Sequence, residues 1–141
     1  MMKFGLVCIL MIHALLIYAQ EIEYDLSDFC ENSIKNTEIY YCINNESKDL
    51  RIIFTGKSCL EVISIENEDF IKLLKRRKVA NIITYHSNNI SNDEIQIEFI
   101  LSQVTKKSYK ERFFIKNHSW SRIYVNAENK WKKGQGIPPR E

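Results

Sequence analysis

The clearest alternation of apolar and polar residues in this chain runs from Ile95 to Val104. Apolar residues occupy odd-numbered positions, namely Ile95, Ile97, Phe99 and Leu101, and polar residues occupy even-numbered ones, namely Gln96, Glu98 and Ser102. Successive side chains of a strand point to opposite faces of its sheet, so this spacing predicts a half-buried strand. One apolar and one polar face are typical of an antiparallel sheet.

Six further segments are rich in β-branched and aromatic residues and are predicted strands. They are Glu38–Ile43, Leu50–Phe54, Leu60–Ile65, Val79–Tyr85, Arg112–Lys116 and Ser121–Val125. Turn-like residues separate the first three, at Asn44 to Ser47 and at Gly56 to Ser58. This arrangement predicts a β meander over residues 38–65.

Helical spacing is found between Glu68 and Arg77, where the apolar residues Phe70, Leu73 and Leu74 share one face. Asn67 can cap the start, acidic residues occupy the first turn, and a basic run follows at the end where cations favour the helix dipole. The basic run comprises Lys75, Arg76, Arg77 and Lys78. We expect an amphipathic helix near residues 68–77, and its polarity explains these cations without a ligand.

The remaining segments carry weaker patterns. Residues 20–37 are acidic, with Tyr24, Leu26 and Phe29 as anchors, and we expect an arm or short helix there; Trp131 docks against the sheet. Residues 134–141 contain two glycines and two prolines and predict a flexible tail. The order of strands, helix and strands predicts an α+β fold: one small domain over residues 20–133, mainly antiparallel β-sheet with one helix across it.

The first nineteen residues resemble a secretory signal peptide in their order of features. Lys3 is followed by an apolar run from Phe4 to Tyr18 and by the small residue Ala19. The run is shorter than the roughly 20 residues of a bilayer span. We expect residues 1–19 to be cleaved before Gln20, and the product to be secreted and extracellular, with no membrane span.

Three cysteines remain beyond the leader: Cys30, Cys42 and Cys59. In an oxidising compartment this number predicts one intramolecular disulfide, and it leaves three pairings open. The third thiol is either buried or pairs with a second molecule to form a disulfide-linked dimer. A catalytic cysteine would need a histidine partner, and the sequence offers none nearby.

Three Asn-x-Ser sequons begin at Asn45, Asn89 and Asn117, each between two apolar segments. A bulky glycan is tolerated in surface loops, which is where we expect these asparagines to lie. The sequence therefore predicts a secreted glycoprotein.

Charge is distributed unevenly along the chain, although the whole carries a net charge of only +2. Acidic residues predominate over residues 21–69 and basic residues over 70–141. Such a basic half could face an anionic glycan, lipid headgroups or an acidic protein. Alternatively, the two halves pair with each other inside one domain. The leader argues against a nucleic-acid role for the basic run.

The chemistry-bearing residues form no recognisable catalytic motif. His86 and His118 are the histidines beyond the leader, and a secreted hydrolase or nuclease using both is the alternative we keep open. Metal-ligand spacing, a Gly-rich phosphate loop and a Gly-x-Ser-x-Gly elbow are all missing from the sequence, so we expect neither a metal nor another cofactor.

Aromatic residues and cations concentrate near the end of the chain. Trp120, Arg122, Tyr124 and Trp131 are candidate partner-binding residues, because such side chains are enriched in binding hot spots, although a sheet core uses the same residues. With no catalytic motif, we expect an extracellular binding or effector protein, of toxin-like, immune-modulating or cytokine-like kind. Its partner would be an extracellular protein or an anionic glycan. A carrier of a small apolar ligand is a further alternative.

Overall fold

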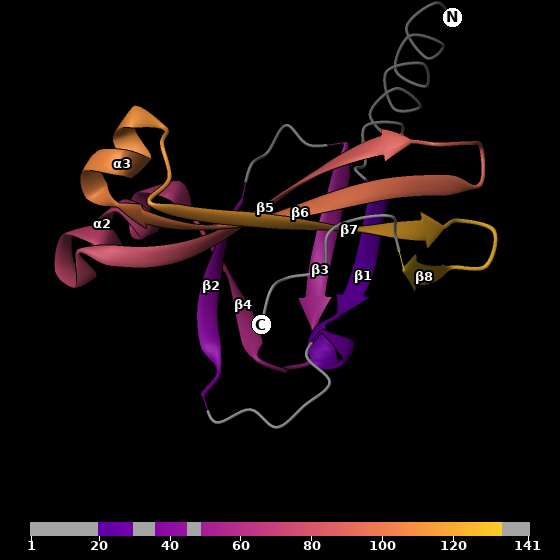
Figure 1. Ribbon diagram of the computed structural model, residues 1–141, viewed down its shortest axis with the longest axis horizontal. Coiled ribbons are helices and arrows are strands. Elements are labelled where there is room, and N and C mark those ends of the chain that lie inside the picture. Colours follow the sequence, from indigo (N-terminus) through magenta and orange to yellow (C-terminus); the bar gives the residue numbers. More distant parts are fainter. Residues whose placement is uncertain (1–19, 30–35, 45–48, 134–141) are drawn as a thin grey trace, which may run out of the picture.

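The computed structural model describes residues 20–29, 36–44 and 49–133 (Figure 1), so the predicted leader and tail lie outside the described residues. These form β1 (Gln20–Asp25), the 3-10 turn η1 (Leu26–Asp28), β2 (Glu38–Ile43), β3 (Leu50–Thr55), β4 (Leu60–Ile65), α2 (Asn67–Arg77), β5 (Val79–Asn89), β6 (Glu94–Thr105), α3 (Lys106–Glu111), β7 (Lys116–Val125) and β8 (Lys130–Lys133). The fold is mostly β with two short helices, broadly as the α+β prediction states.

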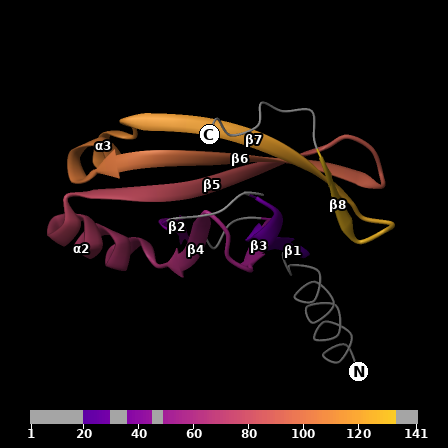
Figure 2. The same ribbon diagram turned by 60° about the horizontal axis from the view of Figure 1, so that its bottom comes forward.

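The strands pair in two sheets. One has the order β4-β2-β5-β6-β7-β8, and β1 pairs with β3 in the other. From β5 to β8 each strand is antiparallel to the next one, whereas β2 is parallel to both β4 and β5. In Figure 2 the long strands β5, β6 and β7 form one layer, and strands β1 to β4 lie beneath it.

The predicted meander over residues 38–65 is wrong. Strand β3 leaves β2 and β4 and pairs in parallel with β1, from Gln20 opposite Leu50 to Asp25 opposite Thr55. The reason is tertiary, because Leu50 and Ile52 of β3 bury beside Ile22 and Tyr24 of β1 in one apolar cluster. Propensity identified these strands but carried no information about their partners.

Strand bounds agree with the prediction at β2 and β4, and β5, β6 and β7 extend beyond their predicted ends. The predicted strand Arg112–Lys116 is wrong. Arg112 takes a left-handed conformation, with φ of 57°, to end α3, and β7 begins only at Lys116. The apolar residues between them imitate a strand in sequence but run along the end of the sheet.

Two elements near the ends of the described chain were not predicted as strands. Residues 20–25 form β1 instead of an arm or helix, because alternate burial of Ile22 and Tyr24 is combined with hydrogen bonds to a strand about thirty positions away. Trp131 does dock on the sheet, as a residue of β8 that lies opposite Tyr124.

Two apolar cores lie on opposite faces of the long sheet. The aromatic core surrounds Phe99, whose ring stacks on Trp120 at 5.0 Å between centroids and also contacts Tyr24 and Trp131. The helix-side core joins Phe70, Leu73 and Leu74 of α2 to residues of the opposite sheet face, including Ile82 and Val104. The three buried residues of α2 are those that the sequence predicts.

The start of α2 differs from the prediction. Glu66 takes the N-cap position, but its side chain forms no capping hydrogen bond and instead accepts one from the Asn44 side chain at 3.0 Å. Asn67 is the first helical residue. The Asn67 side chain instead accepts a hydrogen bond from the Tyr109 hydroxyl at 2.5 Å. The residue chosen from the sequence as a cap therefore links α2 to α3.

Candidate functional site

Helices α2 and α3 lie at the same end of the long sheet, beside the start of β5, the end of β6 and the start of β7 (Figure 1). The Tyr109 ring of α3 meets Phe70 of α2 edge-on, with 5.1 Å between centroids. The Tyr109 hydroxyl donates a hydrogen bond to the Asn67 side chain, and burial raises the pKa of this phenol. This contact fixes the two helices to each other.

Helix α3 is short but is held at both ends. Thr105 and Ser108 form a reciprocal capping box, in which each side chain bonds the backbone of the other residue. At the far end, the backbone N–H of Phe113 donates to the Ser108 carbonyl. The N–H of Ile115 donates to Gln103 of β6 at 2.9 Å, which fixes the segment after the helix.

The segment between α3 and β7 exposes three consecutive large apolar side chains. Phe113, Phe114 and Ile115 are 49%, 43% and 53% exposed, and we call these three residues the apolar tip. Its backbone is held by hydrogen bonds at both ends, so the exposure belongs to an ordered segment. Val79, which is also exposed, lies near this tip, opposite Thr105 in the sheet.

Cations gather at the same end of the sheet as the apolar tip. Four exposed cations lie in the last turn of α2 and at the residue after it, and five lie on or beside α3: Lys75, Arg76, Arg77 and Lys78, and Lys106, Lys107, Lys110, Arg112 and Lys116. We call these nine residues the basic end. Among the described residues, none of the nine is in an ion pair, since the pairs formed there involve other cations.

The ion pairs of the described chain also decide between two readings of the charge pattern. Arg51 pairs with Glu21, Lys57 with Glu61, and Lys130 with Glu128, each within its own half of the chain. Only the neighbours Lys72 and Asp69 join the acidic and basic halves, at 3.8 Å. Within the described residues, the two halves therefore do not neutralise each other through distant ion pairs.

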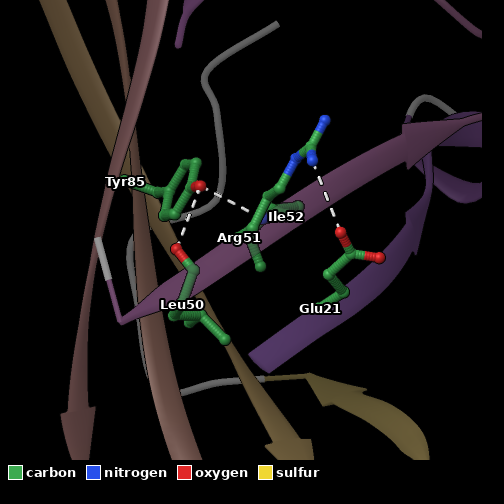
Figure 3. Close-up of polar contacts among 5 residues, drawn as sticks. All are labelled: Glu21, Leu50, Arg51, Ile52 and Tyr85. Atoms are coloured by element: carbon green, nitrogen blue, oxygen red, sulfur yellow. Dashed lines mark hydrogen bonds and ion pairs between the residues drawn. The ribbon is translucent and has the colours of Figure 1, made fainter. Parts of the chain in front are cut away.

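A second feature is a cavity of about 380 Å³ between β3, β2 and β4, lined in part by Arg51, Asn44, Glu66 and Tyr85. Figure 3 shows the Tyr85 side chain reaching from β5 to β3. Its hydroxyl accepts from the Ile52 N–H at 3.0 Å and donates to the Leu50 carbonyl at 3.3 Å. Arg51 turns away toward Glu21 of β1, at 3.4 Å.

Tyr85 therefore closes part of the β3 edge that β1 does not cover. The Gln20 N–H donates to the Asp49 carbonyl. Because the backbone N–H and C=O groups of a strand alternate between its two edges, those of the even-numbered β3 residues point away from β1. Burial raises the pKa of the Tyr85 phenol, and its hydrogen bond with Ile52 partly offsets the rise. The lining of this cavity is mixed, because apolar residues such as Phe54 and Val62 lie beside Arg51 and Glu66, whereas a carrier of a small apolar ligand would need a predominantly apolar lining.

The two histidines of the enzyme hypothesis do not share a cleft. His86 lies opposite Glu98 and pairs with it at 2.8 Å, on the sheet face that carries Ile82. His118 lies opposite Leu101, whose side chain belongs to the aromatic core on the other face. Because side chains alternate faces along each strand, the imidazoles point to opposite sides of the sheet.

The four candidate partner-binding residues lie mostly in the core. Trp120 and Tyr124 are buried, and Trp131 packs edge-on to Tyr124 and donates its indole N–H to the Glu23 carbonyl. Arg122 is half-buried and donates to the Ser121 carbonyl at 3.2 Å. Trp120 and Tyr124 therefore belong to the core of the folded protein, the alternative role that the sequence also allows.

Two of the three cysteines beyond the leader lie within the described chain. Cys42 of β2 is buried, and Cys59 is half-buried just before β4. Cys30 lies outside the described residues, so the disulfide and its three possible pairings stay a prediction.

Two of the three sequons lie within the described chain. Asn89 is exposed at the end of β5, beside the turn to β6, in agreement with the predicted surface setting. Asn117 is also exposed but lies within β7 and not in a loop, and its side chain accepts a hydrogen bond from Ser102 at 3.5 Å. Asn45 lies outside the described residues.

Within the part of the chain that the structure describes, no helix has both the length and the apolar character needed to cross a bilayer. The same residues contain no group of three or more His, Cys, Asp or Glu side chains placed to hold a metal ion.

The sequence identified only part of the basic end. The run from Lys75 to Lys78 stood out as a block, but the cations of α3 are dispersed and their helix was not predicted. The apolar tip was assigned to a strand. A usable signal was the sequence from Arg112 to Lys116, in which two cations enclose three large apolar residues. Comparison of the chain with protein-family models, with curated proteins and with solved structures found no match.

Proposed function

We propose that this protein is a small secreted glycoprotein that acts by binding, and that it docks on a polyanionic extracellular partner through its basic end. One observation carries the proposal: nine exposed cations from two separate segments gather at one end, and within the described chain no carboxylate pairs with them. Unpaired cations at one end create a positive potential that attracts an anionic surface.

The secreted part of the proposal rests on the leader-like sequence of residues 1–19 and on the sequons. Exposure of Asn89 and Asn117 is compatible with glycans at both positions. N-terminal sequencing of the secreted product should find Gln20 first, and deglycosylation should increase its electrophoretic mobility. A product that retains Met1 inside the cell would contradict this part.

Binding is tested by heparin affinity chromatography in a salt gradient, with heparin as a model polyanion. The charge variant Arg76→Gln/Arg77→Gln/Lys107→Gln removes three cations from the basic end. The control variant Lys130→Gln/Lys132→Gln/Lys133→Gln removes three from β8, at the other end of the long sheet (Figure 1). Both lower the net charge equally, so a difference between them reports position and not total charge.

We expect the wild-type protein and the control variant to elute at similar salt, and the charge variant to elute much earlier. Salt screens exposed charges beyond about 8–10 Å at physiological strength, so retention should fall steeply along the gradient. Failure of heparin to retain the wild-type protein, or equal elution of the two variants, would contradict a specific basic docking surface.

A further inference from the structure

The apolar tip lies within the basic end, and charge alone does not account for it. Phe113, Phe114 and Ile115 expose apolar surface side by side, with Arg112 and Lys116 at either end of the triplet. Soluble monomers rarely expose contiguous apolar patches of large size without a binding role. The partner of this end should therefore offer both negative charge and an apolar phase.

We propose that the basic end docks on the surface of an anionic lipid bilayer, with the apolar tip entering the headgroup region; this rests on the function proposed above. Aromatic side chains favour the membrane interface, and cations beside them are attracted by anionic headgroups. The combination of a basic surface and exposed Phe or Leu side chains is the chemistry of proteins that lie on membranes.

Two other occupants fit the surface less well. A sulfated glycan would pair with the cations but would leave the three apolar side chains in water. A second copy of this chain, packed tip to tip, would bring the two sets of unpaired cations together, and like charges in contact oppose association. An anionic bilayer satisfies both the cations and the apolar tip.

The fold also holds the tip ready for such contact. The capping box at Thr105 and Ser108 orders α3, and backbone hydrogen bonds fix Phe113 and Ile115 to α3 and β6. Docking then needs no ordering of this backbone, which would otherwise oppose binding. The cations of α2 join the same end through the contact of Tyr109 with Phe70.

The test compares co-sedimentation of the full secreted protein with vesicles of phosphatidylcholine alone and with vesicles that also contain phosphatidylserine. The tip variant is Phe113→Gln/Phe114→Gln. Its matched control is Ile63→Gln/Ile90→Gln, which replaces two exposed apolar residues of β4 and of the β5–β6 turn. The charge variant described above is included, and every protein is also run on heparin.

We expect the wild-type protein and the matched control to bind the anionic vesicles, with little binding to phosphatidylcholine alone. The tip variant should bind these vesicles roughly 10- to 100-fold more weakly, because two aromatic side chains no longer leave water. It should still elute from heparin with the wild-type protein. The charge variant should bind vesicles on the order of 100-fold more weakly and also elute early from heparin.

The outcomes separate the two proposals. Retention on heparin without binding to anionic vesicles, or equal vesicle binding by the tip variant and wild type, overturns the lipid inference and leaves the basic docking surface intact. If the wild-type protein binds neither heparin nor anionic vesicles, the basic docking surface and the lipid inference are both overturned. As a second measurement, brominated phosphatidylserine in the vesicles should quench the fluorescence of the tryptophan introduced by Phe114→Trp. If this fluorescence is not quenched, insertion of the tip is also overturned.

Discussion

The two faces of the long sheet are closed in different ways. On one face, rings from β1, β3, β5, β7 and β8 contact Phe99 of β6, and the β1–β3 pair covers this aromatic core. On the other face, α2 and α3 cover a smaller core around Phe70, and the segment after α3 leaves its large apolar residues in solvent.

This difference separates stability from binding. Chain segments distant in sequence meet in the aromatic core, so most of its large side chains are buried against one another inside the protein. The helix end has short local elements, unpaired cations and exposed apolar residues, which contribute little to folding. Replacing a residue that is exposed to a partner should therefore change the free energy of unfolding little, and replacing a residue of the aromatic core should lower it strongly.

The largest effect is expected from Phe99→Ala. Phe99 is fully buried and its ring contacts Tyr24, Trp120 and Trp131, among others. Removing a buried Phe costs about 3–5 kcal/mol of unfolding free energy, and the lost ring pairs place this site near the upper end. Urea denaturation measures the change.

Two controls sharpen that comparison. Phe70→Ala, in the helix-side core, should also cost several kcal/mol but less than Phe99→Ala, because Phe70 has fewer aromatic neighbours. Phe114→Ala, at the apolar tip, should change stability by less than about 0.5 kcal/mol. A large loss at Phe114 would show that the tip is structural and would remove the basis for a docking role.

The predicted disulfide should give the next largest effect. Two of the three possible pairings of Cys30, Cys42 and Cys59 include Cys59, and we test first its pairing with Cys30. Cys59→Ser should then cost about 2–4 kcal/mol of unfolding free energy, chiefly by freeing the unfolded chain. Denaturant unfolding with and without reductant measures this loss.

Double substitution identifies the partner. Cys30→Ser/Cys59→Ser should be no less stable than Cys59→Ser alone, because the bond is already broken. Cys42→Ala is the control and should leave the response to reductant unchanged. A stability loss in Cys42→Ala that removes the reductant effect would assign the bridge to Cys42 instead.

A smaller loss of stability than at Phe99 or at the disulfide is expected at Tyr85. Tyr85→Phe removes the acceptor of the Ile52 N–H and should cost about 1–2 kcal/mol of unfolding free energy. Burial raises the pKa of this phenol above 10 in the folded state, so folding favours the protonated form. Its contribution is present below pH 10 and is lost as the pH rises through the folded pKa.

Unfolding measurements at neutral and at alkaline pH test this prediction. Tyr85→Phe should reduce the fall in stability at alkaline pH relative to the wild-type protein. Tyr109→Phe is the comparison on the helix side, where the phenol pKa is also raised by burial but the hydroxyl donates to the exposed Asn67 side chain. An alkaline profile of Tyr85→Phe identical to wild type would contradict the assigned role of this hydroxyl.

Local patterns were sufficient wherever burial follows one strand or one helix face. The strands at Glu38–Ile43 and Leu60–Ile65 have their predicted bounds, and Phe70, Leu73 and Leu74 are the buried face of α2. The same reasoning failed at Arg112–Lys116, because three adjacent apolar residues have strand propensity whether or not a partner strand is present. The prediction for residues 20–25 failed for the opposite reason, because these residues form a strand only by pairing with β3, which is distant in sequence.

By itself, the sequence determined that the protein is mostly β, where most strands and the main helix lie, and that its second half is basic. Only the tertiary structure decided that β1 pairs with β3, that His86 and His118 face opposite sides, and that two cation-rich segments meet around an apolar tip. Alternation and helical spacing report which side of an element is buried. Which elements then meet depends on packing between residues far apart in the chain, and one sequence does not encode that in any local pattern.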